Sequence, residues 1–120
     1  MNPLRIIRSF QHAFRGILDI FLHCPNMRIH ILAALLAMVL AFILKISPME
    51  WCLILTCVFV VIAAEMINSA IEYTIDLVTK EQKELAKKAK DAAAGAVLIL
   101  AIFSLLTACI IFIPKIIKCC

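Results

Sequence analysis

Four polar side chains follow one another at helical spacing in a segment that is otherwise largely apolar. Glu65, Asn68, Glu72 and Asp76 stand three or four residues apart. On an α-helix, at about 100° per residue, they fall within an arc of roughly 80° and line one face for about three turns. Charged groups inside a membrane are costly and usually mark function. The spacing therefore predicts a functional polar row, defined here as these four residues.

The residue types in the polar row suit proton transfer and metal binding. Mg²⁺ prefers oxygen ligands and is usually held by one or two carboxylates together with substrate phosphates. Glu65 follows fourteen mostly apolar residues, so it would lie deepest and could take a proton from a lipid hydroxyl. Glu72 and Asp76 lie nearer the charged segment, where Lys90 could neutralise phosphate charge and Asp91 could position a ligand. The same carboxylates could instead serve a proton or cation pathway, and the residues alone leave both possibilities open.

The composition predicts that these residues lie in a membrane. The chain has 120 residues and is 65% hydrophobic, whereas soluble domains contain about 45–50% apolar residues. A small globule cannot hide such an excess, because small domains keep much of their surface exposed. The formal charge of +4 is modest and is not gathered into a basic stripe, so nucleic acid is not expected as a partner. We predict an all-α membrane protein with a single domain at residues 1–120.

The apolar pattern divides this domain into one surface helix and three membrane spans. Residues 1–23 repeat apolar positions at spacings of three and four between basic ones, which is typical of an amphipathic helix at a membrane surface. Apolar stretches long enough to cross a bilayer follow at residues 27–46, 51–78 and 91–113. A tight turn is expected at residues 47–50 and a charged cytoplasmic connector at residues 79–90. Pro114 is expected to end the third span.

The distribution of basic residues predicts the orientation of these spans. If the N-terminus is cytoplasmic, nine lysines and arginines lie inside and three lie outside. This satisfies the positive-inside bias, and the reverse orientation violates it. The C-terminus is then outside. The inside group comprises Arg5, Arg8, Arg15, Arg28 and the five connector lysines, and the outside group comprises Lys45, Lys115 and Lys118.

Two motifs resemble one known family. The run ExxNSAIExxxD at residues 65–76, followed by AKDAAAGAV at residues 89–97, is similar to the bacterial integral-membrane diacylglycerol kinase and undecaprenol kinase family. The likeness extends from Arg5 to Lys115. It implies an ATP-dependent lipid kinase of the bacterial inner membrane, which moves the γ-phosphoryl group of ATP to a membrane lipid alcohol with Mg²⁺ as cofactor. It also implies a homotrimer with active sites between subunits, close to the cytoplasmic interface.

The resemblance assigns roles to individual positions. Glu65 matches the catalytic base, and Glu72 matches a metal-binding carboxylate. The lipid substrate is implied to contact Arg5, Glu65 and Ala94. Contacts with the nucleotide are implied for Arg5, His12, Asn68, Glu72, Asp76, Glu81, Gln82, Lys83, Lys90 and Asp91.

Cys24 departs from the family pattern, because the family's other metal-binding glutamate falls at this position. A thiol is a soft ligand and a poor one for Mg²⁺. Either metal binding is weakened, or a neighbour such as Asp19 compensates, or this copy is inactive. Alternatively, His23, Cys24 and His30 form an incomplete transition-metal site. A packing or interfacial role is the simpler interpretation of His30.

The choice of lipid depends on a finer likeness. Residues 26–30 and 90–95 resemble the undecaprenol kinase branch more than the diacylglycerol kinase branch, so undecaprenol is the favoured substrate and diacylglycerol the next. Two other classes of function stay open. One is a catalytically weakened relative that binds nucleotide or lipid without turnover, and the other is a small cation- or proton-conducting membrane assembly.

Overall fold

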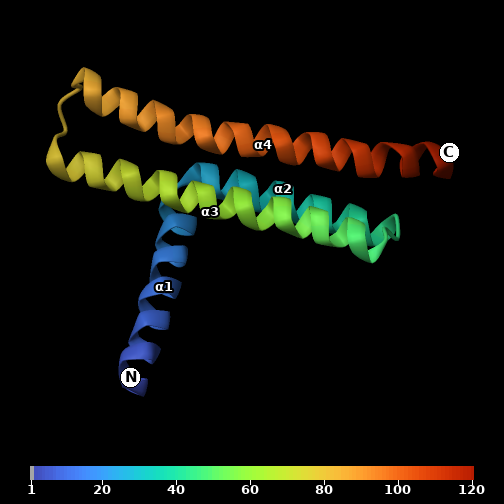
Figure 1. The fold of residues 1–120 in the computed structure, drawn as a ribbon, viewed down its shortest axis with the longest axis horizontal. Helices are drawn as coiled ribbons and strands as arrows, with labels where there is room; N and C mark the ends of the chain where they lie inside the picture. Colours follow the sequence, from blue (N-terminus) through green and yellow to red (C-terminus); the bar gives the residue numbers. More distant parts are fainter. Residues whose placement is uncertain (1) are drawn as a thin grey trace.

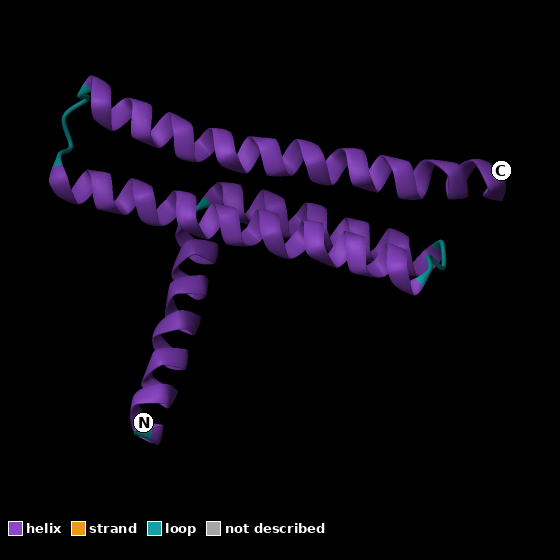
Figure 2. Cartoon of the chain, viewed as in Figure 1, coloured by secondary structure: helices purple, strands orange, loops and turns teal. Residues whose placement is uncertain are grey.

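The structure, a computed structural model, describes residues 2–120, and all regular structure in that range is helical (Figure 2). The helices are α1 (Pro3–His23), α2 (Pro25–Ile43), α3 (Pro48–Val78) and α4 (Glu84–Cys119). By length and composition, α2, α3 and α4 can each cross a membrane. The prediction of an all-α membrane protein is confirmed.

The three long helices lie along one another, and α1 leads away across their direction (Figure 1). The loop between α3 and α4 lies at one end of this bundle. The turn between α2 and α3 and the C-terminus lie at the other end. This crossing of α1 relative to the long helices fits the prediction that its amphipathic sequence forms a surface helix.

Three prolines begin helices in this chain. Pro3, Pro25 and Pro48 each stand in the first turn of a helix, where proline is favoured because no backbone N–H is needed. At α3 the Ser47 hydroxyl accepts from the Glu50 backbone N–H at 3.2 Å, and the Glu50 carboxylate accepts from the Ser47 N–H at 3.0 Å. This reciprocal cap stabilises the start of the helix.

The helix ends differ from the predicted span ends at several points. α2 begins two residues before the predicted span and ends at Ile43, after which Lys45 adopts a positive φ of 51°. α3 begins at Pro48 rather than at Trp51. Only residues 79–83 of the predicted connector are non-helical. The Lys88 ammonium lies 3.5 Å from the Glu84 carboxylate one turn away, a pairing that supports the first turns of α4.

The expectation that Pro114 ends the last helix is wrong, since α4 continues through it to Cys119. A proline inside a helix removes one backbone hydrogen bond, and membrane helices tolerate this where neighbouring groups compensate. The ammonium of the next residue, Lys115, lies 3.1 Å from the Glu50 carboxylate at the start of α3. This ion pair holds the last turns of α4 against the bundle.

The buried core lies at the end of the bundle away from the loop between α3 and α4. Ala41 of α2, Ile54 of α3, Ile111 and Phe112 of α4 and Ile46 of the turn are all buried together. Many large apolar side chains on the outer faces are exposed, as expected for helices that face lipid or other subunits. The core thus fixes the register of three helices and leaves the second half of α3 for polar residues.

Candidate active site

The polar row occupies the second half of α3 and runs from a buried end to an exposed end. Glu65 is 3% exposed and Asn68 is 4% exposed, whereas Glu72 is partly buried and Asp76 is exposed. Among residues 2–120, the three buried polar side chains are Glu65, Asn68 and Ser69, which all lie on this one stretch of helix. The row therefore connects the interior of the bundle with the charged loop at residues 79–83.

Glu65 is the buried carboxylate of the site. Its Oε2 atom lies 3.5 Å from Nε2 of His30, which reaches it from α2. Burying a charge is costly unless it is paired and hydrogen-bonded, so a polar neighbour at this point is expected on physical grounds. His30 also lines an apolar cavity of about 270 Å³ between α2, α3 and α4. The sequence suggested a packing or interfacial role for His30 and did not predict its contact with Glu65.

Asn68 and Glu72 form the middle of the polar row. The Asn68 amide donates to Oε1 of Glu72 across one helical turn at 3.4 Å, which is a long contact. Its Oδ1 atom is buried and has no hydrogen-bond partner among residues 2–120. A buried carbonyl oxygen without a partner is costly. The pair thus offers a carboxylate and an unpaired amide oxygen side by side, both of the hard type that Mg²⁺ takes.

The exposed end of the row is joined to α4. The Lys90 ammonium lies 2.6 Å from Oδ1 of Asp76, and the Lys87 ammonium lies 2.6 Å from Oδ2 of Asp91. Beside them is a cavity of about 250 Å³ between the end of α3 and the start of α4. It is lined by Ile75, Thr79, Lys80, Glu81, Gln82, Ala86, Lys87, Lys90 and Asp91. Four predicted nucleotide contacts therefore share one cavity: Glu81, Gln82, Lys90 and Asp91.

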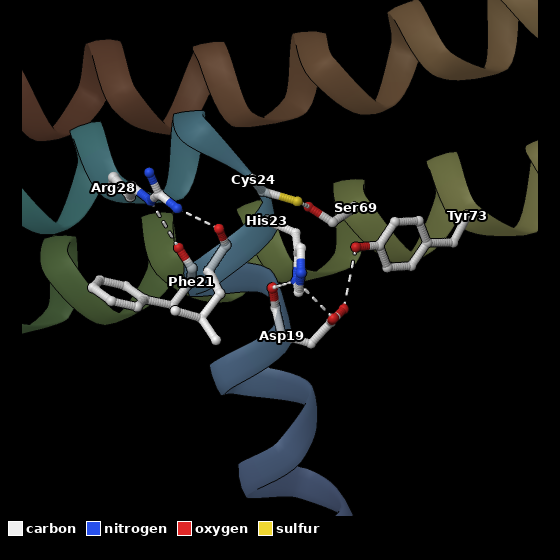
Figure 3. A network of polar contacts seen from close by, with 8 residues as sticks. Asp19, Phe21, His23, Cys24, Arg28, Ser69 and Tyr73 are labelled. Atoms are coloured by element: carbon white, nitrogen blue, oxygen red, sulfur yellow. Dashed lines mark hydrogen bonds and ion pairs between the residues drawn. The ribbon is translucent and has the colours of Figure 1, made fainter.

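Cys24 lies between α1 and α2 and faces α3 (Figure 3). The Ser69 hydroxyl contacts the Cys24 sulfur at 3.6 Å. Because Ser69 precedes Glu72 by three residues, the two lie on neighbouring turns of the same helix side. Cys24 is therefore close to the level of the Glu72 carboxylate, and the structure supplies a thiol at that level.

Asp19 is already engaged by other side chains. Its Oδ2 atom accepts from the Tyr73 hydroxyl at 3.1 Å, and its Oδ1 atom lies 3.0 Å from Nδ1 of His23 (Figure 3). Arg28 lies nearby and donates to the backbone carbonyls of Phe21 and Leu22 at the end of α1. These contacts attach the end of the surface helix to α3 and to the start of α2.

The transition-metal alternative is wrong for this chain. His23 contacts Asp19, Cys24 contacts Ser69, and His30 contacts Glu65, so each goes to a different partner. Within the described residues, no three side chains of histidine, cysteine, aspartate or glutamate are placed to hold a metal ion together. A magnesium site in this chain would need oxygens from outside this set, such as those of a phosphate.

The remaining predicted site residues form no hydrogen bond or ion pair with the polar row within the described chain. Arg5 and His12 are exposed on the part of α1 that leads away from the bundle (Figure 1). Ala94 is exposed on α4, and Lys83 caps the start of that helix without lining the cavity. Arg5, His12, Lys83 and Ala94 therefore do not line the loop cavity of this chain.

Three residues of the site were not predicted from the sequence. Ser69 lies about 40° from Glu65 around the helix, so the same helical arithmetic could have found it. Tyr73 follows Glu72 directly but points toward α1, where it meets Asp19. The contact of His30 with Glu65 was only weakly indicated, by the presence of a polar ring in an apolar span. Contacts between helices are not visible in one sequence.

Comparison with known proteins shows the family of this chain. Residues 11–112 match the family model described as prokaryotic diacylglycerol kinase. The chain is 40% identical over 111 residues to the undecaprenol kinase of Bacillus subtilis (strain 168), covering 92% of this chain and 90% of that protein.

Diacylglycerol kinases are also similar over most of their length. The chain is 34% identical over 107 residues to that of Escherichia coli (strain K12), covering 89% of this chain and 88% of that protein. It is 34% identical over 99 residues to that of Helicobacter pylori (strain ATCC 700392 / 26695), covering 82% and 77%. The family match includes most of α1, all of α2 and α3 with the whole polar row, and most of α4. The chain belongs to the prokaryotic diacylglycerol kinase family.

Proposed function

We propose that this protein is an ATP-dependent lipid kinase that transfers the γ-phosphoryl group of ATP to the hydroxyl of a membrane lipid alcohol, with undecaprenol preferred to diacylglycerol. The observation that carries the proposal is the buried carboxylate of Glu65 at the inner end of the polar row. An intramembrane acid is expensive and indicates function by default. A lipid hydroxyl is a substrate that must be deprotonated at such a depth.

The reaction balances with Glu65 as the base. The lipid hydroxyl oxygen attacks the γ-phosphorus, the bond from that phosphorus to the bridging oxygen breaks, and ADP leaves. The hydroxyl proton passes to the Glu65 carboxylate and later to water. General base catalysis of this kind contributes about 10²–10⁴ in rate. Phosphoryl transfer otherwise depends mainly on positioning and on neutralising the phosphate charge.

The residues toward the loop suit the nucleotide. Lys90 can neutralise phosphate charge, and Glu81 and Gln82 line the cavity beside it. Glu72 and the unpaired Oδ1 of Asn68 can supply two oxygens to Mg²⁺. Mg²⁺ is usually held by one or two carboxylates together with substrate phosphates, so Glu72 supplies the carboxylate of such a site. When bound, the ion would neutralise charge on the phosphate oxygens.

We also propose that the working unit is a homotrimer with sites between subunits, in the bacterial inner membrane. The direction of α1 supports this, because the helix that carries Arg5 and His12 leads away from the bundle (Figure 1). An N-terminus in the cytoplasm and a C-terminus outside fit the distribution of basic residues. The loop at residues 79–83 and the C-terminus also lie at opposite ends of the bundle (Figure 1).

The preference for undecaprenol is supported by the similarity to the Bacillus subtilis undecaprenol kinase, at 40% identity against 34% for the two diacylglycerol kinases compared. In the test, the purified protein is placed in a bilayer that contains both lipids, and labelled ATP and Mg²⁺ are added. We expect labelled lipid phosphate, formed faster from undecaprenol. Nucleotide binding without product would instead identify the weakened relative. Acid-dependent ion flux without product would identify a conducting assembly.

A further inference from the structure

We propose that His30 is a positioning residue for the catalytic base, holding one carboxylate oxygen of Glu65 so that the other faces the acceptor hydroxyl. The inference rests on the proposed function and adds a residue on a second helix. Its basis is the contact of 3.5 Å between Nε2 of His30 and Oε2 of Glu65. This contact joins α2 to α3.

The burial of both side chains makes this contact consequential. The side chain of Glu65 is 4% exposed and that of His30 is 20% exposed. A carboxylate this deep has lost most of its water, and a buried charge needs a compensating donor. His30 is the side chain placed within ion-pair distance of Glu65 in the described chain. The neighbouring cavity is otherwise lined by apolar residues and Ser104. The Ser104 hydroxyl donates to the Leu100 carbonyl of its own helix at 2.8 Å.

The geometry defines what His30 can do. In this role the Nε2–H tautomer of His30 is directed at Oε2 of Glu65 across the ion-pair separation of 3.5 Å, and Oε1 of Glu65 is the atom that receives the proton from the lipid hydroxyl. No proton moves to or from the imidazole, so the proton balance of the reaction is unchanged. The distance is longer than that of an ordinary hydrogen bond. Contacts of catalytic bases are often this long until the substrate complex forms, when they tighten.

The role predicts a defect in turnover rather than in nucleotide binding. His30→Leu fills the same space without a donor, and kcat should fall roughly 10-fold to 100-fold. This is the range typical for loss of a partner that orients a catalytic or metal-binding group. The KM for Mg-ATP should stay within about twofold of wild type, because the substitution removes no contact with the nucleotide. His30→Gln retains an N–H donor at a similar reach and should restore most of the lost kcat.

The measurement is steady-state phosphotransfer to the lipid by wild type, His30→Leu, His30→Gln and a control, Ser104→Ala. The control alters the same cavity wall without touching Glu65 and should behave as wild type. Unchanged kcat in His30→Leu overturns the inference, as does an equal loss in both His30 variants or a rise in the KM for Mg-ATP alone. If His30→Leu fails to assemble, the kcat of His30→Gln decides, and a value at or below a tenth of wild type overturns the donor role. Absence of lipid phosphate with the wild-type protein would contradict the proposed function itself, which is a distinct outcome.

Discussion

The Lys90 ammonium of α4 lies 2.6 Å from the Asp76 carboxylate of α3, although the two residues are 14 positions apart in the chain. The pair closes the loop at residues 79–83 and joins the exposed end of the polar row to the rim of the loop cavity. The same ammonium thus joins two helices and lines the loop cavity, where we propose that it meets a phosphate.

Replacing Lys90 should weaken the use of ATP. Lys90→Ala is expected to raise the KM for ATP about tenfold or more, since a hydrogen bond to a charged group contributes about 1.5–3 kcal/mol. The matched control is Lys88→Ala, whose partner Glu84 lies 3.5 Å away on the same helix. An exposed pair of that kind contributes little. Equal effects of the two substitutions on the KM for ATP would remove Lys90 from the nucleotide site.

Glu72 should govern the requirement for Mg²⁺. Glu72→Gln keeps the shape of the side chain and its place beside Asn68 but removes a charged oxygen ligand. The Mg²⁺ concentration for half-maximal activity should therefore rise, and binding of Mg-ATP should weaken. The measurement is activity titrated with Mg²⁺ at saturating lipid. A titration identical to that of wild type would eliminate Glu72 as a metal ligand.

Cys24 provides a test by gain of function. Its sulfur contacts Ser69 at 3.6 Å, about one turn from Glu72, so Cys24→Glu would place a hard oxygen ligand near that level. We expect higher activity at low Mg²⁺, because a second carboxylate strengthens a site completed by phosphates. No increase at any Mg²⁺ concentration, in a properly assembled protein, would mean that Cys24 does not face the metal.

Tyr73 should hold the surface helix to the bundle. Tyr73→Phe removes the hydroxyl that donates to Asp19 at 3.1 Å, a loss of about 1 kcal/mol for an exposed hydrogen bond. Backbone amides in the second half of α1 should then exchange with deuterium faster. The control is Thr74→Val, since the Thr74 hydroxyl donates to the Ala70 carbonyl of its own helix at 2.7 Å. Unchanged exchange in Tyr73→Phe would show that other contacts hold α1.

Patterns within single helices were predicted well from the sequence. The polar row of Glu65, Asn68, Glu72 and Asp76 lies on one helix because helical periodicity alone determines which residues share a face. Hydrophobic length likewise identified three helices able to cross a membrane. Helix ends were predicted less well. Pro25 and Pro48 begin helices, and Pro114 lies inside one, because a proline's effect depends on which backbone groups around it need partners.

Contacts between helices could not be predicted from the residues alone. The approach of His30 to Glu65 and that of Tyr73 to Asp19 depend on how α1 and α2 pack on α3. A single sequence carries no record of that packing. The roles of Arg5 and His12 stay predictions, because no contact in the described chain joins either residue to the polar row.

The central claim is that Glu65 is the base that deprotonates the lipid hydroxyl, and the most direct measurement compares phosphotransfer by wild type, Glu65→Gln and Glu50→Gln in the same bilayer. Glu50 lies on the same helix but pairs with Lys115 at the far end of the bundle, so its variant should keep near-normal turnover. Glu65→Gln should lose about 10²–10⁴ in kcat while it assembles normally and still binds Mg-ATP. Near-normal formation of lipid phosphate by Glu65→Gln would contradict the account.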